Sequence, residues 1–119
     1  MDPILAIRIS AIVGFLAVAL GAFGAHLLKA RLAALQMTEV WHTAVFYHLV
    51  HAVVMLFLAG RPVFARNAWL LFLVGIILFS GSLYLMAATG AKWLGPITPI
   101  GGICLLAGWL SLAIWAFAA

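Results

Sequence analysis

The side chains that could do chemistry in this chain are imidazoles and hydroxyls set inside long apolar stretches. They are His26, Tyr47, His48, His51, Ser80, Ser82 and Tyr84. Tyr47 and His48 stand four and three residues before His51, so that the three side chains share one surface of a helix, whereas His42 points nearly opposite to His51. The apolar stretches are long enough to cross a membrane, as their length and composition show below. Polar groups inside a bilayer cost free energy, and each one is therefore a functional hypothesis.

The favoured interpretation of these groups is structural. We expect His51 and His26 to be neutral imidazoles, each donating a hydrogen bond to a serine, a tyrosine hydroxyl or a free carbonyl and thereby fastening helices together. Interhelical hydrogen bonds of this kind contribute about 0.6 to 2 kcal/mol each. A complete nucleophile triad and a cofactor fingerprint are both missing from the sequence, so no catalytic residue is predicted and the balance is against an enzyme.

Two sharper interpretations remain open. Neutral imidazole binds zinc, copper and iron, but a metal or haem site needs a second helix, and only His26 is available, at a different depth. No acidic residue stands by to orient the rings. A proton-coupled transporter needs a titrating group near the middle of the bilayer, whereas Asp2 and Glu39 lie at helix starts, where they complement the helix dipole. No cofactor or metal ligand is therefore predicted.

The stretches that carry these residues have the length of membrane spans. Of the 119 residues, 69% are apolar and 7% are charged, whereas about a quarter of the residues of a soluble domain are charged. Crossing about 30 Å of hydrocarbon takes roughly 20 apolar residues. We predict a single all-α domain over residues 1–119. It is a bundle of four transmembrane helices, at about 3–28, 39–60, 68–88 and 99–118, with both termini on the same side.

Capping residues and breakers predict the ends of these helices. The expected N-caps are Asp2, Thr38, Asn67 and Thr98, with Pro3 and Pro99 at first helical positions. Pro62 ends the second helix near Gly60, and Gly90 provides a left-handed stop for the third. Residues 29–38 are amphipathic but too short to span, so we expect them to lie along the membrane interface.

The basic residues favour lipid over nucleic acid as the counter-charge. The net charge is +4, but the six Lys and Arg residues are scattered over helix ends and form no stripe. One predicted face could hold a lipid phosphate, and it comprises Lys29, Arg31, Lys92, Thr98 and Pro99. The favoured interpretation of this face is ordinary interfacial anchoring, with Trp41 and Trp93 as belt residues. Basic residues nearly tie across the two sides, and the free amino terminus favours cytoplasmic termini.

Small residues at helical spacing predict where the helices approach closely. In lipid, helices associate through van der Waals packing, which small residues permit. The glycines assigned to packing are Gly14, Gly21, Gly24, Gly75, Gly81, Gly101 and Gly108. The first helix, which carries three of them, is expected to be central. Cys104 lies in an apolar run and is expected to pack there.

Four ordered strings are familiar. They are residues 21–26 (Gly-Ala-Phe-Gly-Ala-His), Tyr47 with residues 51–52, residues 78–84 (Leu-Phe-Ser-Gly-Ser-Leu-Tyr), and residues 98–102 (Thr-Pro-Ile-Gly-Gly) with 107–109 (Ala-Gly-Trp). Over essentially its whole length the chain resembles the domain of unknown function 423 family, small membrane proteins that include transmembrane protein 256. The resemblance implies a four-helix inner-membrane protein without an established activity. It places on characteristic positions His26, Tyr47, His51, Ser80, Ser82, Tyr84, Thr98 and Pro99. In that family the residue at the position of His48 often resembles glutamine, and this favours a hydrogen-bonding role for His48 over metal ligation.

We therefore expect a multi-pass protein of the bacterial inner membrane that works as a non-enzymatic structural or accessory subunit. Its expected partners are lipid and either further copies of itself or a larger membrane complex, with no nucleic acid. The alternative is a histidine-centred protein that binds a hydrophobic ligand, a metal or haem, or a small proton-coupled transporter.

Overall fold

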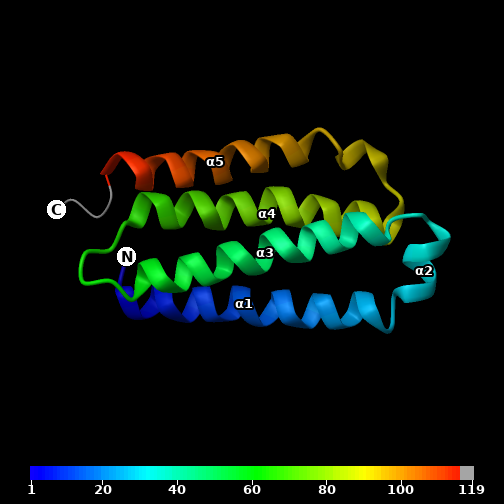
Figure 1. Cartoon of the computed structure of the whole chain (residues 1–119), viewed down its shortest axis with the longest axis horizontal. Helices are drawn as coiled ribbons and strands as arrows, with labels where there is room; N and C mark the ends of the chain where they lie inside the picture. Colours follow the sequence, from blue (N-terminus) through cyan, green and yellow to red (C-terminus); the bar gives the residue numbers. More distant parts are fainter. Residues whose placement is uncertain (116–119) are drawn as a thin grey trace.

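The computed structural model describes residues 1–115, which form four long helices running alternately up and down (Figure 1). The long helices are α1 (Pro3–Ala25), α3 (Thr38–Ala59), α4 (Arg66–Thr89) and α5 (Ile97–Trp115), and the short ones are α2 (Lys29–Ala34) and the 3-10 helix η1 (Lys92–Leu94). No strand occurs within the described residues. The predicted all-α architecture is confirmed, with the N-terminus and the end of α5 at the same end of the bundle (Figure 1).

Four helical segments are long and apolar enough to cross a membrane. They are α1, α3 and α4, of 23, 22 and 24 residues, and the stretch Lys92–Trp115. At about 1.5 Å per residue each is roughly 33 to 36 Å long, which matches the hydrocarbon thickness of a bilayer. The predicted end of the last helix, at residue 118, lies outside the described residues.

Three of the predicted helix ends are confirmed. The carboxylate of Asp2 accepts a hydrogen bond of 3.0 Å from the amide of Ile4, with proline at the start of α1. α3 ends with Gly60 at its C-cap, and Gly90 ends α4 with φ of 76°. Near its end α1 is shorter than predicted, since the amide of Leu28 bonds back to the carbonyl of Phe23 at 2.9 Å.

The other three predicted N-caps are wrong. Thr38 and Asn67 lie inside α3 and α4, and the cap positions are taken by Met37 and Ala65, which make no side-chain capping bond. Thr98 lies inside α5. The connecting backbone closes the first turns itself, with the amide of Trp41 bonding to the carbonyl of Met37 at 3.0 Å. A side-chain cap is therefore not needed to start these helices.

The segment after α1 is a short helix and a turn across one end of the bundle (Figure 1). Within α2 only Leu32 is buried, and it packs against Trp41 of α3 and Ala87 of α4. Gln36 then turns the chain with φ of 57°. The apolar side of this amphipathic segment faces protein and not only the membrane interface.

The two central helices are α3 and α4, and the prediction that α1 is central is wrong. Within an 18-residue window of each span, buried residues make up 39% in α3 and in α4, but 22% in α1 and 17% in Lys92–Trp115. α1 packs chiefly on α3, and α5 packs on α4. The glycines of α1 all serve its contact with α3, and a helix needs no central position to make one such contact.

Glycines of α4 and α5 allow these two helices to approach closely. A Cβ atom on Gly101 would lie 2.2 Å from the backbone nitrogen of Phe79. Cβ atoms on Gly75 and Gly108 would lie 2.5 Å from Leu105 and 2.6 Å from Phe72. The predicted packing role of these three glycines agrees with their surroundings.

The remaining predicted packing glycines differ from one another. A Cβ on Gly24 would lie 2.2 Å from the indole nitrogen of Trp41, and one on Gly21 would lie 3.3 Å from Val45. Gly14 has ordinary contact distance to Ala52, at 4.0 Å, and a Cβ on Gly81 would meet no described atom within 4 Å. The packing role predicted for Gly81 is therefore wrong.

Candidate functional site

One histidine ring joins three helices at the centre of the bundle. Nε2 of His48 lies 2.8 Å from the carbonyl oxygen of Val13 in α1, and Nδ1 lies 2.8 Å from the hydroxyl of Tyr84 in α4. Because a carbonyl oxygen only accepts, Nε2 carries the proton, and in the neutral ring Nδ1 accepts from the tyrosine hydroxyl. His48 is buried and acts as a hydrogen-bonded link between α1, α3 and α4.

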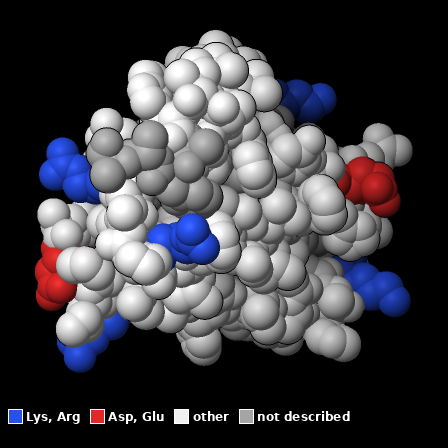
Figure 2. Space-filling view, turned by 60° about the vertical axis from the view of Figure 1, so that its left-hand side comes forward, with Lys and Arg blue, Asp and Glu red and all other residues white. Residues whose placement is uncertain are grey.

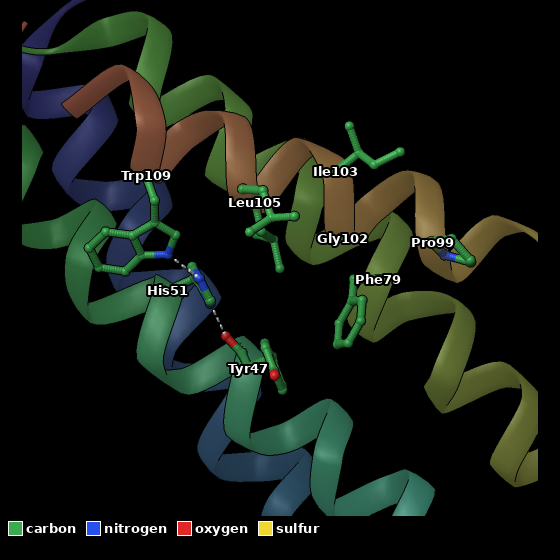
Figure 3. A pocket seen from close by; sticks show the side chains of 9 residues that line it. Tyr47, His51, Phe79, Pro99, Gly102, Ile103, Leu105 and Trp109 are labelled. Atoms are coloured by element: carbon green, nitrogen blue, oxygen red, sulfur yellow. Dashed lines mark hydrogen bonds between the residues drawn. The ribbon is translucent and has the colours of Figure 1, made fainter. Parts of the chain in front are cut away.

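The second buried histidine is tied by both ring nitrogens. Nδ1 of His51 lies 2.6 Å from the carbonyl oxygen of Tyr47, and the indole N–H of Trp109 donates to Nε2 at 3.0 Å (Figure 3). The carbonyl accepts a proton that must therefore reside on Nδ1, and Nε2 must be unprotonated to accept from Trp109. His51 is thus a neutral imidazole that connects α3 to α5.

The structure does not bring His26 into this group. His26 follows the last residue of α1, where it takes the C-cap position, and its side chain is exposed. The expectation that His26 and His51 both donate to neighbouring helices is therefore wrong. The side chain of His26 is exposed, and His51 donates to the carbonyl of Tyr47 in its own helix. His51 accepts from an indole instead, and it is His48 that bonds to a tyrosine hydroxyl and a carbonyl.

The serine hydroxyls connect α4 to both of its neighbours. Ser80 donates to the carbonyl of Ala44 in α3 at 2.8 Å. Ser82 lies 2.6 Å from the hydroxyl of Thr98 in α5 and also donates to the carbonyl of Phe79 at 2.9 Å when it is not the donor to Thr98. Thr98, predicted as a cap, is instead a partner of Ser82.

Tryptophan indoles supply interhelical bonds that were not predicted from the sequence. Trp41, assigned there to an interfacial belt, is 3% exposed and donates to the carbonyl of Leu20 in α1 at 2.9 Å. Trp69 is fully buried and donates to the hydroxyl of Ser10 in α1 at 2.9 Å. An indole N–H far from the interface needs an acceptor, and the positions of Trp69 and Trp109 inside apolar stretches were the available signal.

Two of the residues predicted to bind a phosphate, Arg31 and Thr98, make hydrogen bonds within the protein instead. The guanidinium of Arg31 donates to the carbonyl of Ala88 at 2.7 Å, so it stabilises the negative end of α4. Lys29 and Lys92 are exposed, whereas Thr98 bonds to Ser82. On the face shown in Figure 2, charged side chains are isolated spots on a surface that is otherwise uncharged.

A groove of about 430 Å³ lies between α3, α4 and α5. Its lining comprises Tyr47, His51, Phe79, Pro99, Gly102, Ile103, Leu105, Leu106 and Trp109 (Figure 3). The ring of Tyr47 stacks on that of His51, with a centroid distance of 6.1 Å, and lies 4.7 Å from that of Phe79. The hydroxyl of Tyr47 has no hydrogen-bond partner within residues 1–115, and the residue is 39% exposed.

The donor set of this region suits hydrogen bonding better than metal binding. Both nitrogens of His51 are engaged, and so are both nitrogens of His48. In the described part of the chain, no three His, Cys, Asp or Glu residues are close enough to hold a metal ion together. Chemically, the groove offers aromatic surfaces and one free hydroxyl.

Removing the His51 imidazole is expected to lower the free energy of unfolding by about 1 to 2 kcal/mol, because the indole N–H of Trp109 then lies without an acceptor. His51→Gln should restore much of this loss, since its amide oxygen can accept from the indole. Thermal unfolding in one fixed detergent measures both. His42→Ala is the matched control, since its side chain is 61% exposed. A melting temperature of His51→Ala equal to that of His42→Ala would contradict the assigned role.

Comparisons with known proteins find relatives that are named membrane proteins. A family model described as "Protein of unknown function (DUF423)" matches residues 20–102. The UPF0382 membrane protein YwdK of Bacillus subtilis is 43% identical over 92% of this chain and 94% of its own length. A UPF0382 membrane protein of Haemophilus influenzae is 41% identical over 90% of this chain and 89% of its own length.

The similarity extends to a eukaryotic protein. The UPF0382 membrane protein C1782.12c of Schizosaccharomyces pombe is 33% identical over 90% of this chain and 97% of its own length. No solved structure matches the chain. The predicted integral membrane location is confirmed, and an inner-membrane location agrees with the bacterial relatives.

Proposed function

The chain belongs to the DUF423 family of membrane proteins, and we propose that it is a non-enzymatic accessory protein that packs through an outer helix against a second copy or a larger membrane complex. Its other surfaces contact lipid. The protein then contributes a stable apolar surface within the bilayer, and the polar residues hold that surface in shape.

One observation carries this proposal. Within residues 1–115, every buried side-chain nitrogen and oxygen has a hydrogen-bond partner inside the chain. A reactive centre in the core would need at least one group that is free to meet a substrate. The buried polar groups are instead used between helices, and this supports a structural role for them.

The outer helices supply the surfaces for packing. Phe15 on α1 is 70% exposed, and Leu106 and Leu110 on α5 are 69% and 61% exposed. Ile103, Leu106, Leu110 and Ile114 follow one another at steps of three and four residues, so they form one apolar face of α5. Both lipid and an apolar helix of another chain can cover such a face.

Site-specific cross-linking distinguishes these two. In a Cys104→Ser background, single cysteines replace Phe15 on α1, Leu110 on α5 and, as a control, Ile77 on α4, which is also exposed. We expect an efficient cross-link in native membranes from one outer helix only, to a second copy or to one protein at fixed ratio. Cross-links to lipid alone from all three positions, with a monomer in mild detergent, would overturn the proposal.

A second role, the binding of a hydrophobic molecule, is supported by the groove between α3, α4 and α5. Its lining includes two residues of the predicted polar group, Tyr47 and His51. The metal, haem and transporter alternatives have no such observation in their favour within residues 1–115.

A further inference from the structure

We infer that the groove between α3, α4 and α5 binds a neutral, membrane-soluble molecule with an apolar tail and a carbonyl oxygen, which accepts a hydrogen bond from the hydroxyl of Tyr47. This inference rests on the second of the two proposed roles. Packing through α1 leaves it unaffected, whereas packing through the apolar face of α5 would share Ile103 and Leu106 with the rim of the groove.

The depth of Tyr47 requires an acceptor that is not water. At about 1.5 Å per residue, Tyr47 lies about 14 Å from the first residue of α3 and about 18 Å from the last. The residue therefore lies well inside the span, where water is absent and an unpaired polar group costs several kcal/mol. No group within residues 1–115 accepts from it, so the acceptor comes with the occupant of the groove.

The charge of the lining indicates a neutral occupant. None of the nine lining residues is acidic or basic apart from His51, and the hydrogen bond from Trp109 keeps that ring neutral. A carboxylate or an ammonium group in the groove would have no counter-charge and would be costly to bury. A carbonyl oxygen accepts without carrying charge.

The shape of the groove indicates an extended tail. Along α5 the lining runs from Pro99, near the start of the helix, to Trp109, a rise of about 15 Å. Ile103 and Leu106 on its rim are 65% and 69% exposed, so a molecule can enter sideways from the lipid. The ester carbonyls of membrane lipids lie at the interface, near the ends of the spans, and a membrane-soluble carbonyl compound reaches the depth of Tyr47 more readily.

The probe pair is 2-decyl-1,4-benzoquinone and decylbenzene, which has the same tail but no carbonyl. Each is titrated into the purified full chain in detergent, and bound molecules are counted by native mass spectrometry. We expect the quinone to bind more tightly than decylbenzene. Tyr47→Phe, which removes only the hydroxyl, should weaken quinone binding about five- to tenfold and leave decylbenzene unchanged.

Filling the groove provides an independent variant. A Cβ on Gly102 would lie 3.8 Å from the ring of Phe79, an ordinary contact, so Gly102→Leu can place its side chain in the groove. This variant should lose binding of both probes. Gly81→Leu is the matched control, because a Cβ there meets no described atom within 4 Å and Gly81 does not line the groove. If Gly102→Leu does not fold, Leu106→Trp narrows the rim instead.

Three results would overturn the inference. They are unchanged quinone binding in Tyr47→Phe, equal affinity for both probes, and full binding in a folded groove-filling variant. Binding is also measured in nanodiscs of dioleoylphosphatidylcholine and of its diether analogue, which has no ester carbonyl. Quinone binding that occurs only in the diether lipid would mean that a lipid ester occupies the Tyr47 hydroxyl in the ordinary lipid. Cross-linking from the outer helices is unaffected by all of these results, so the two proposals fail separately.

Discussion

Gly101→Ala is expected to lower the free energy of unfolding by about 3 kcal/mol, at the upper end of the usual cost of overpacking. The added Cβ would lie 2.2 Å from the backbone nitrogen of Phe79 and 2.7 Å from the carbonyl carbon of Leu78. These are atoms of the α4 backbone, and no rotamer change can move them. The two helices would have to separate along their shared face. Unfolding of the purified protein in mixed micelles, titrated with a denaturing detergent, measures the loss.

The next residue of α5 provides the control. A Cβ on Gly102 would lie 3.8 Å from Phe79, so Gly102→Ala should leave stability unchanged or slightly raised, since alanine favours helices by up to about 1 kcal/mol over glycine. Gly81→Ala should behave similarly. If Gly101→Ala were as stable as Gly102→Ala, the close approach of α4 and α5 would be contradicted.

The same contact holds the groove in shape. The backbone of Phe79 lies at the point of closest approach on α4, and its ring lines the groove beside Tyr47. A displacement of α5 away from α4 would move Pro99, Gly102 and Trp109 relative to the Tyr47 hydroxyl. Stability and binding are therefore linked at Gly101, but they are separable at Gly102 and Tyr47.

The sequence predicted the elements of this fold well because span length and helix-breaking residues act locally. Asp2 caps α1 and Gly90 ends α4 as predicted. The sequence did not predict which face of each helix lies inward. Lipid and protein core are both apolar, so a membrane helix shows little of the hydrophobic periodicity that orients helices of soluble proteins. Trp41 was consequently assigned to the interface, although it is buried.

The candidate site was predicted as a neighbourhood and not as a set of bonds. Tyr47 and His51 were expected on one helix surface, and they line the same groove. His48 shares part of that surface, yet its ring points between α1 and α4. The partners of these side chains, such as Trp109, lie far away in the sequence, and nothing in local spacing reveals them. His26 was placed with them because α1 was expected to continue past Ala25.

Gly24→Ala is expected to lower the free energy of unfolding by about 2 kcal/mol. The indole of Trp41 lies against Gly24, and an added Cβ would stand 2.2 Å from its nitrogen and 2.4 Å from its Cδ1. To make room the indole must move away from α1, and it then loses the 2.9 Å hydrogen bond to the carbonyl of Leu20. The same micelle titration measures this loss.

A double-mutant cycle tests whether Gly24 acts through the indole. Trp41→Phe removes the hydrogen bond and part of the ring, and in that background Gly24→Ala should cost clearly less than in the parent, because the smaller ring has no hydrogen bond to lose when it moves away from the added Cβ. Gly21→Ala is the matched control on α1, where the Cβ would lie 3.3 Å from a methyl group of Val45, a much milder contact than 2.2 Å. Additive losses for Gly24→Ala and Trp41→Phe would mean that α1 is held to α3 by contacts other than this indole. A coupling of about 1 kcal/mol or more would show that the contact between Gly24 and the indole of Trp41 fixes the register of α1 against α3.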